Sequence, residues 1–71
     1  MIDTADLNNR FTYHSPKEGQ EAKYSNIRRN GLALAELINA MCPDSREKSL
    51  AITKLEEVVM WANASIARAK E

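Results

Sequence analysis

A proline at position 43 separates two long stretches in which apolar residues recur every three or four positions. This spacing is typical of amphipathic helices. The residue before a proline disfavours helical backbone, so the first helix is expected to end at Cys42. Its apolar stripe contains Tyr24, Ile27, Gly31, Leu34, Ile38 and Met41, and the second stripe contains Ile52, Leu55, Val59, Ala62 and Ile66. Because the connecting loop is short, we expect an antiparallel two-helix hairpin.

Capping signals set the expected start of both long helices. Ser15-Pro16-Lys17-Glu18 has the form of a capping box with proline at the first helical position, which predicts a helix over 16–42. Asp44, with Glu47 three positions later, predicts that a second helix starts after the proline and covers 45–69.

The preceding arm, residues 1–14, is predicted to hold one short helix around residues 4–9. The aromatic run from Phe11 to His14 is prone to extended structure and is soon followed by proline, so we expect it to be non-helical. The predicted fold is therefore a single all-α domain over 1–71, an antiparallel two-helix hairpin with a short N-terminal helix.

A chain of 71 residues buries little surface on its own, and such small domains usually need a disulfide, a metal or partner subunits. Cys42 is the only cysteine and His14 the only histidine, so neither an internal disulfide nor a structural zinc site can form. Many apolar residues also fall outside the two stripes, among them Leu32, Ala35, Leu37, Leu50, Ala51, Val58, Met60, Trp61, Ala64 and Ala67. A short N-terminal helix covers little of this surface, so we expect a homo-oligomer.

Composition argues against several classes of partner. Ten basic and ten acidic side chains give a formal net charge of zero, whereas proteins that bind DNA or RNA polymers normally present a basic face. The start of the chain is acidic and unlike a signal peptide, and no run approaches the roughly 20 apolar residues of a membrane span. The single cysteine fits a reducing compartment, and we expect a cytoplasmic protein.

Residue patterns that accompany catalysis are missing from the sequence. It has no glycine-rich phosphate loop, no cysteine–histidine pair close in sequence and no His-Glu-x-x-His metal motif. Asp44 and Glu47 could form a carboxylate pair, but helix capping explains both more simply. We therefore expect no catalytic residues, no metal ligands, no cofactor and no enzyme activity.

Residues suited to binding a nucleotide are present in the arm and the first long helix. Phe11, Tyr13 and His14 offer rings on which bases could stack, and Arg28, with Arg29 beside it, could donate paired hydrogen bonds to phosphates. Simpler roles remain open for them. The arginines could pair with Glu21 or Glu36, Tyr13 could fill a subunit contact, and His14 could be an ordinary hydrogen-bonding residue.

Beyond these patterns, nearly the whole chain resembles a family of small phage anti-defence proteins. The resemblance is carried by Phe11–Pro16, Ile27-Arg28, Cys42–Ala51 and, most specifically, Leu55–Arg68 with its Met-Trp-Ala-Asn core. Members of this family, the Acb2/Tad1 helical-hairpin family, are sponges for cyclic oligonucleotides that block CBASS immunity, and the hairpin domain is shared with sponges acting against Thoeris. The resemblance implies an anti-CBASS sponge in the cytoplasm of an infected host cell.

The resemblance also implies an assembly and ligand sites. Family members are homohexamers that hold cyclic dinucleotides between protomers without cleaving them, and some hold cyclic trinucleotides at a separate site on a three-fold axis. By position, Tyr13 matches the residue that stacks on a base and Arg28 matches the basic side chain on the dinucleotide phosphate. Asn30 and Arg68 fall near positions that line the trinucleotide site, although Asn30 replaces the small hydroxyl residue expected there.

Other functions fit the residues less well. The main alternative is a helical protein–protein interaction module with no nucleotide ligand, which the surplus apolar surface would also suit. A hydrolase of the same ligands is the third hypothesis, and a helix-turn-helix DNA binder is the fourth. Ligand preference, including that for signals derived from ADP-ribose, depends on pocket geometry, and hexamers, trimers and dimers could all cover the apolar surface.

Overall fold

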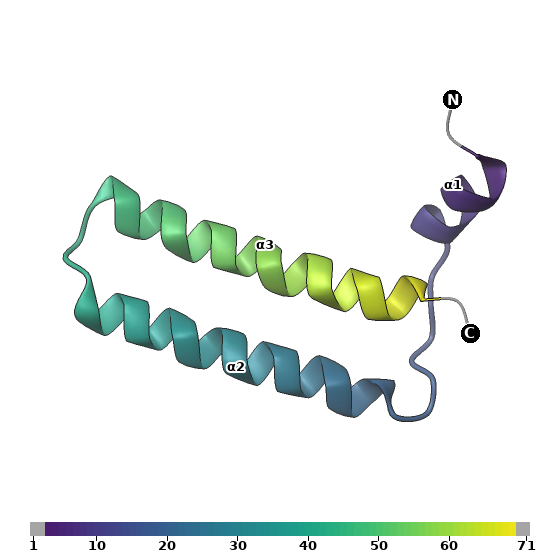
Figure 1. Ribbon diagram of the computed structural model, residues 1–71, viewed down its shortest axis with the longest axis horizontal. Coiled ribbons are helices and arrows are strands. Elements are labelled where there is room, and N and C mark those ends of the chain that lie inside the picture. The colour runs from purple at the N-terminus through teal and green to yellow at the C-terminus, as the bar shows by residue number, and fades with distance from the viewer. Residues whose placement is uncertain (1–2, 70–71) are drawn as a thin grey trace.

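The computed structural model describes residues 3–69, and this part of the chain folds into three α-helices with no strand. They are α1 (Thr4–Phe11), α2 (Gln20–Met41) and α3 (Arg46–Arg68). The two long helices lie side by side and antiparallel, and α1 lies beyond the open end of the hairpin, near the end of α3 (Figure 1). The predicted all-helical hairpin with a short N-terminal helix is confirmed. Within the described range, no helix is long and apolar enough to cross a membrane.

Half-buried side chains mark the seam between the two long helices. On α3 they include all five residues of the predicted stripe: Ile52, Leu55, Val59, Ala62 and Ile66. On α2 they are Tyr24, Ile27, Gly31, Ala35 and Ile38. None of the described residues is fully buried. The stripe of α3 is therefore confirmed, and a single hairpin leaves its seam partly open to solvent.

The predicted stripe of α2 is wrong at two positions. Leu34 is 45% exposed and Met41 is 74% exposed, whereas Ala35, predicted to lie off the stripe, is half-buried. From Gly31 the seam advances by four residues to Ala35 and then by three to Ile38, so Leu34 falls at its edge. Met41 is the last residue of α2, where the chain turns into the loop.

Gly31 allows α2 and α3 to approach closely. A Cβ atom added at this position would lie 2.6 Å from Cγ2 of Val59, which is closer than two carbon atoms can pack. A glycine inside a helix lowers stability by about 1 kcal/mol relative to alanine. At position 31 the facing valine packs so closely that only a residue without a Cβ atom fits.

The first long helix begins four residues later than predicted, at Gln20 instead of residue 16. Gly19 interrupts the helical path with φ 84° and ψ −16°, the values of the third residue of a type II turn. The amide of Gln20 donates to the carbonyl of Lys17 across this turn, over 3.0 Å. Ser15 is thus not the cap; instead, the side-chain oxygen of Gln20 accepts from the amide of Lys17 at 2.8 Å.

At the other end, the cap of α3 is Ser45 and not the predicted Asp44. The hydroxyl of Ser45 accepts a hydrogen bond from the amide of Lys48 at 3.1 Å, and α3 begins at Arg46. Asp44 instead accepts from Nζ of Lys48 at 2.9 Å, and the same ammonium group donates to the carbonyl of Asn39 at 2.9 Å. Lys48 thereby joins the end of α2 to the start of α3.

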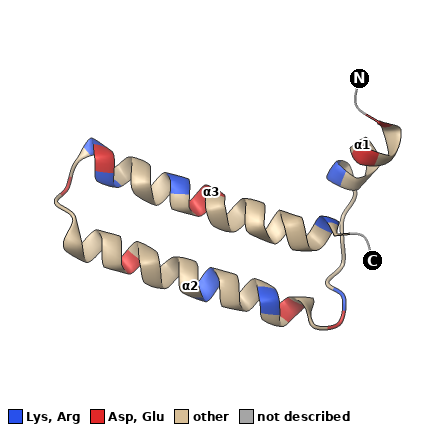
Figure 2. Cartoon of the chain, in the orientation of Figure 1, with Lys and Arg blue, Asp and Glu red and all other residues tan. Residues whose placement is uncertain are grey.

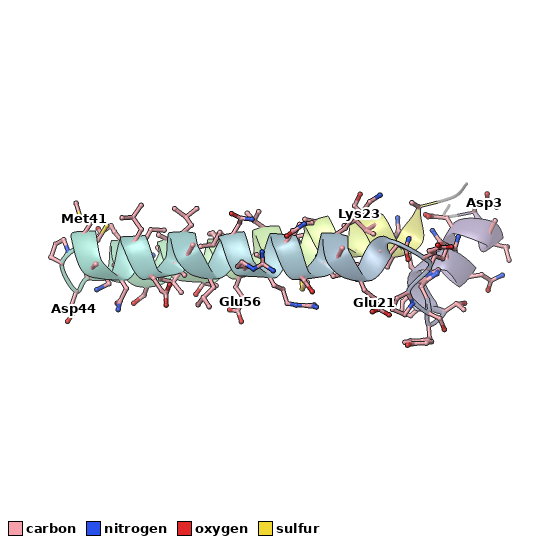
Figure 3. The ribbon with its side chains drawn as sticks, turned by 90° about the horizontal axis from the view of Figure 1, so that it is seen from below. Asp3, Glu21, Lys23, Met41, Asp44 and Glu56 are labelled. Atoms are coloured by element: carbon pink, nitrogen blue, oxygen red, sulfur yellow. The ribbon has the colours of Figure 1, made fainter. Side chains whose placement is uncertain are left out.

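The hairpin is one layer of helices thick and exposes apolar side chains widely. The principal extents are 45 × 33 × 15 Å, and viewed edge-on its side chains project from both flat faces, with Lys23 on one face and Glu21 and Glu56 on the other (Figure 3). Exposed large apolar residues of the long helices include Leu32, Leu34, Leu37, Met41, Leu50, Val58, Met60 and Trp61. Both faces of this thin layer therefore carry apolar surface that the hairpin itself leaves uncovered.

Candidate ligand site

A shallow hollow lies at the open end of the hairpin, where the arm passes α2 and α3. Its volume is about 360 Å³, and it opens broadly to solvent. Its lining comes from the arm, α2 and α3 and consists of Tyr13, His14, Pro16, Tyr24, Arg28, Met60, Asn63, Ala64 and Ala67. Three of the six predicted ligand residues therefore meet at this hollow: Tyr13 and His14 from the arm and Arg28 from α2.

Arg28 supplies the positive charge of the hollow. Within residues 3–69 its guanidinium group forms no ion pair, and the neighbouring Arg29 donates only to the side-chain oxygen of Asn26, at 3.4 Å. The facing part of α3, residues 58–67, carries no charged side chain (Figure 2). The pairing with Glu21 or Glu36 that the sequence left open is not formed in the described structure, so the guanidinium remains free to bind an anion.

Two tyrosines at different depths give the hollow its aromatic surface. Tyr13 is 82% exposed and stands in the non-helical arm, whereas Tyr24 is half-buried on the first turns of α2. A flat ring that is open to solvent on a polar segment can stack on a planar ligand without first leaving a core. The hollow thus combines an accessible ring, a half-buried ring and an unpaired guanidinium group.

His14 is held by the arm itself. Its Nε2 atom lies 2.7 Å from the main-chain oxygen of Asn9 in α1, and because a carbonyl can only accept, Nε2 carries the donated proton. This partly buried contact is the hydrogen-bonding role that the sequence left open for His14. The ring also lines the hollow, so it contributes both to the structure of the arm and to the surface of the site.

The remaining predicted residues lie outside this hollow. Phe11, which was predicted to lie in a non-helical segment, is instead the last residue of α1 and is 85% exposed. Asn30 donates to the carbonyl of Asn26 at 2.8 Å and lines a different hollow, with Ile27, Leu34 and Val58. Since residues two apart on a helix point about 200° apart, Asn30 and Arg28 face opposite sides of the hairpin. Arg68 closes α3.

Among the lining residues that were not predicted to bind ligand, Tyr24, Met60 and Asn63 have the largest side chains. Tyr24 was assigned to the seam, and Met60 to surplus apolar surface. Asn63 was named only as part of the Met-Trp-Ala-Asn core of the resemblance and was given no role, although an amide between Ala62 and Ala64 in an apolar stretch is an unusual feature. Its side-chain oxygen is buried and has no hydrogen-bond partner among the described atoms. A buried unpaired acceptor is costly, so this amide is a further polar group available at the hollow.

The described residues contain no group of three or more histidine, cysteine or acidic side chains that could hold a metal ion.

At the closed end, the hydrogen bond and the positive charge of Lys48 lower the pKa of Asp44 below its ordinary value of 3.8. The ion pair lies at the loop, far along the hairpin from the hollow, and its contacts are those of a helix connection. Neither feature adds a second reactive site.

Comparison with known proteins identifies the family. The family model described as Acb2/Tad1, hairpin domain, matches residues 3–67. The comparisons with curated proteins and with solved structures give no match. The match covers all of α1, α2 and the loop and nearly all of α3, so it includes every helix that shapes the hollow. The known role of this family is that of anti-CBASS sponges, which bind their ligands and are not enzymes. The chain therefore belongs to the Acb2/Tad1 hairpin-domain family.

Proposed function

We propose that this protein is a phage anti-defence sponge that binds and sequesters cyclic di- and trinucleotide second messengers without cleaving them, and thereby blocks activation of CBASS effectors. It would act in the cytoplasm of the infected host cell. The observation that carries the proposal is the meeting of Tyr13 and Arg28 at one hollow, because a ring for a base and a free guanidinium for a phosphate are the two groups that a nucleotide requires.

A complete site requires more than one copy of the chain. The hollow is shallow, whereas sites for small ligands usually bury most of the ligand surface. A two-fold interface would present Tyr13 and Arg28 twice, and a cyclic dinucleotide has two bases and two phosphates to meet them. The exposed apolar side chains on both faces supply the surface for such contacts. We propose a homo-oligomer, with a hexamer as the assembly implied by the family.

A second ligand site for cyclic trinucleotides is proposed at Asn30 and Arg68. Asn30 lies on the face opposite Arg28, so the two proposed sites would use separate surfaces of the hairpin. A three-fold axis would gather three copies of Arg68 for three phosphates. Phe11, exposed at the end of α1, is proposed to contact ligand or a neighbouring protomer next to the dinucleotide site.

The groups in the hollow support the proposal of sequestration without cleavage. Tyr13, Tyr24, Arg28 and Asn63 can stack, pair and hydrogen-bond. His14 is the one imidazole among the lining residues, and its Nε2 proton is donated to the Asn9 carbonyl. Hydrolysis of a phosphodiester needs an activated nucleophile and stabilisation of the transition state, and no carboxylate lines the hollow to activate a water molecule.

The test is isothermal titration calorimetry of the wild-type protein with a panel of cyclic dinucleotides, a cyclic triadenylate and a cyclic ADP-ribose isomer. We expect Tyr13→Ala and Arg28→Ala to weaken dinucleotide binding by at least about tenfold each, since each removes a stacking or charge-assisted contact. Arg29→Ala is the matched control, because Arg29 is the adjacent arginine and does not line the hollow. Chromatography of ligand recovered after denaturation should return it intact.

The main competing function is a helical protein–protein interaction module, which the exposed apolar surface favours. A folded oligomer that takes up no member of the panel would support this alternative and reject the sponge. Linear products in the recovered ligand would instead establish a hydrolase. Equal loss of affinity in Arg28→Ala and Arg29→Ala would show that the phosphate does not bind at the hollow.

A further inference from the structure

The end of α3 leaves carbonyl groups that the helix cannot satisfy, and side-chain amides from two other elements reach them. Nδ2 of Asn9 in α1 donates to the carbonyl of Arg68 at 3.3 Å. Nε2 of Gln20, the first residue of α2, donates at 3.2 Å to the carbonyl of Ile66, which also accepts from the amide of Ala69 at 3.3 Å. The last four carbonyls of an α-helix have no partner within the helix, so these amides serve as a C-terminal cap supplied from outside.

These two amides lie on either side of the non-helical part of the arm, the segment 12–19 between α1 and α2, which carries Tyr13 and is called the arm from here on. Before the arm, Asn9 also accepts the hydrogen bond of His14 through its main-chain oxygen, at 2.7 Å. After it, Gln20 accepts from the amide of Lys17 through its side-chain oxygen, at 2.8 Å. Each amide residue therefore binds α3 with one group and the arm with another, and the arm is attached at both of its ends.

Packing against the rest of the described chain contributes little to the position of Tyr13. Its side chain is 82% exposed, so packing alone does not define its position. A ring on a loosely held segment must be ordered when it meets a ligand, which costs roughly 0.5–1.5 kcal/mol per immobilised side chain, a two- to twelvefold loss of affinity. Holding the arm in advance would reduce this cost.

We propose that Asn9 and Gln20 are positioning residues: by capping the end of α3 they hold the arm, and with it Tyr13, beside the hollow. Neither residue lines the hollow, so they act through the arm rather than on the ligand. The inference rests on the proposed binding of a cyclic dinucleotide at Tyr13, and its first readout requires no ligand.

That first readout is the order of the arm in the ligand-free protein, measured as ¹⁵N relaxation of residues 12–16 in Asn9→Ala and Gln20→Ala. We expect lower order parameters in the arm and unchanged values in the middle of α2 and α3. Asn8→Ala is the matched control, because Asn8 is exposed on the same helix and makes no side-chain hydrogen bond within residues 3–69. An arm that stays as ordered as in the wild type would overturn the proposal.

The second readout is affinity for a cyclic dinucleotide, taken through a double-mutant cycle. Asn9→Ala and Gln20→Ala should each weaken binding on the order of three- to tenfold, and should have no further effect once Tyr13→Ala is present. A loss that persists in the Tyr13→Ala protein would mean direct contact with the ligand and would reject a positioning role. If the wild type binds no cyclic dinucleotide, the proposed function fails, while the relaxation data still decide whether the amides hold the arm.

Discussion

At the closed end of the hairpin, the groups that join the helices are neighbours in sequence, whereas at the open end they are far apart. Lys48 donates to Asp44 and Asn39, four and nine positions away, and Ser45 caps an amide three positions away. At the open end, Asn9 reaches Arg68 across 59 positions and Gln20 reaches Ile66 across 46. Both ends satisfy free helix termini, but only the open end needs the whole hairpin in place first.

This difference bears on function because the candidate site lies at the open end. Contacts between distant residues can form only after the hairpin has closed, and this closure costs chain entropy. They are also the first contacts to be lost when the hairpin loosens. The closed end can persist as a local structure. The arm and its tyrosine instead depend on the packing of α2 against α3, so the seam should control the site from a distance.

The largest expected effect comes from the middle of the seam. In Gly31→Val the new Cβ would already lie 2.6 Å from Val59 Cγ2, and the two methyl groups would extend further, so the helices must separate. Overpacking of this kind typically costs about 1–3 kcal/mol, and we expect the upper part of that range in urea unfolding followed by circular dichroism. Hydrogen exchange should show greater loss of protection at the open end than at the closed end.

Ala33→Val is the matched control for this substitution, because Ala33 lies two residues away on the same helix and is exposed. It places the same valine side chain on an exposed position of the helix without filling the seam. Valine is a better helix former than glycine, so helix propensity alone would not destabilise Gly31→Val, whereas it would destabilise Ala33→Val. A cost of Gly31→Val no larger than that of Ala33→Val would show that packing against Val59 does not limit position 31. Equal loss of protection at both ends would contradict the dependence of the open end on the seam.

A smaller effect is expected at the closed end, from the cap of α3. Ser45→Ala removes the hydroxyl that accepts from the amide of Lys48 and should lower the free energy of unfolding by about 1 kcal/mol. Asp44→Ala removes an exposed ion pair and should cost far less, because Lys48 keeps its bond to the Asn39 carbonyl. Denaturant unfolding of the two variants checks the order, and a reversed order would restore Asp44 as the cap.

The same contrast between local and distant contacts explains what the sequence could predict. Apolar periodicity and Pro43 are local signals, and they predicted the two long helices, the turn between them and all five seam residues of α3. Gly31 was predicted to lie on the apolar stripe of α2, and in the structure it closely approaches Val59 of α3. The family resemblance, carried mostly by the arm and by α3, is confirmed by the match over residues 3–67.

The errors also have physical causes. Ser15-Pro16-Lys17-Glu18 looks like a helix start, but Gly19 adopts a left-handed conformation and delays the helix to Gln20. Asp44 and Ser45 are both good capping residues, and the pattern alone does not separate them.

The amides of Asn9 and Gln20 could not be assigned from the sequence, because their partners are main-chain carbonyls that any residue at that place would provide. The grouping of Tyr13 with Arg28 was expected from the resemblance; Asn63 and Tyr24 required the fold.

The smallest expected effect is an acid response confined to the closed end. The hydrogen bond from Lys48 and its positive charge lower the pKa of Asp44 in the folded protein below its ordinary value of 3.8. A lowered folded-state pKa contributes stability that is present above the unfolded pKa and is lost as the pH falls through the folded one, so the contribution should disappear below about pH 4. Because Asp44 is fully exposed, this contribution is small. Melting temperatures of the wild type and Asp44→Asn, compared from about pH 6 to about pH 2, should differ slightly at the upper limit and converge at the lower. A difference that stayed constant with pH would mean that the carboxylate charge contributes nothing and that Lys48 is held by the Asn39 carbonyl alone.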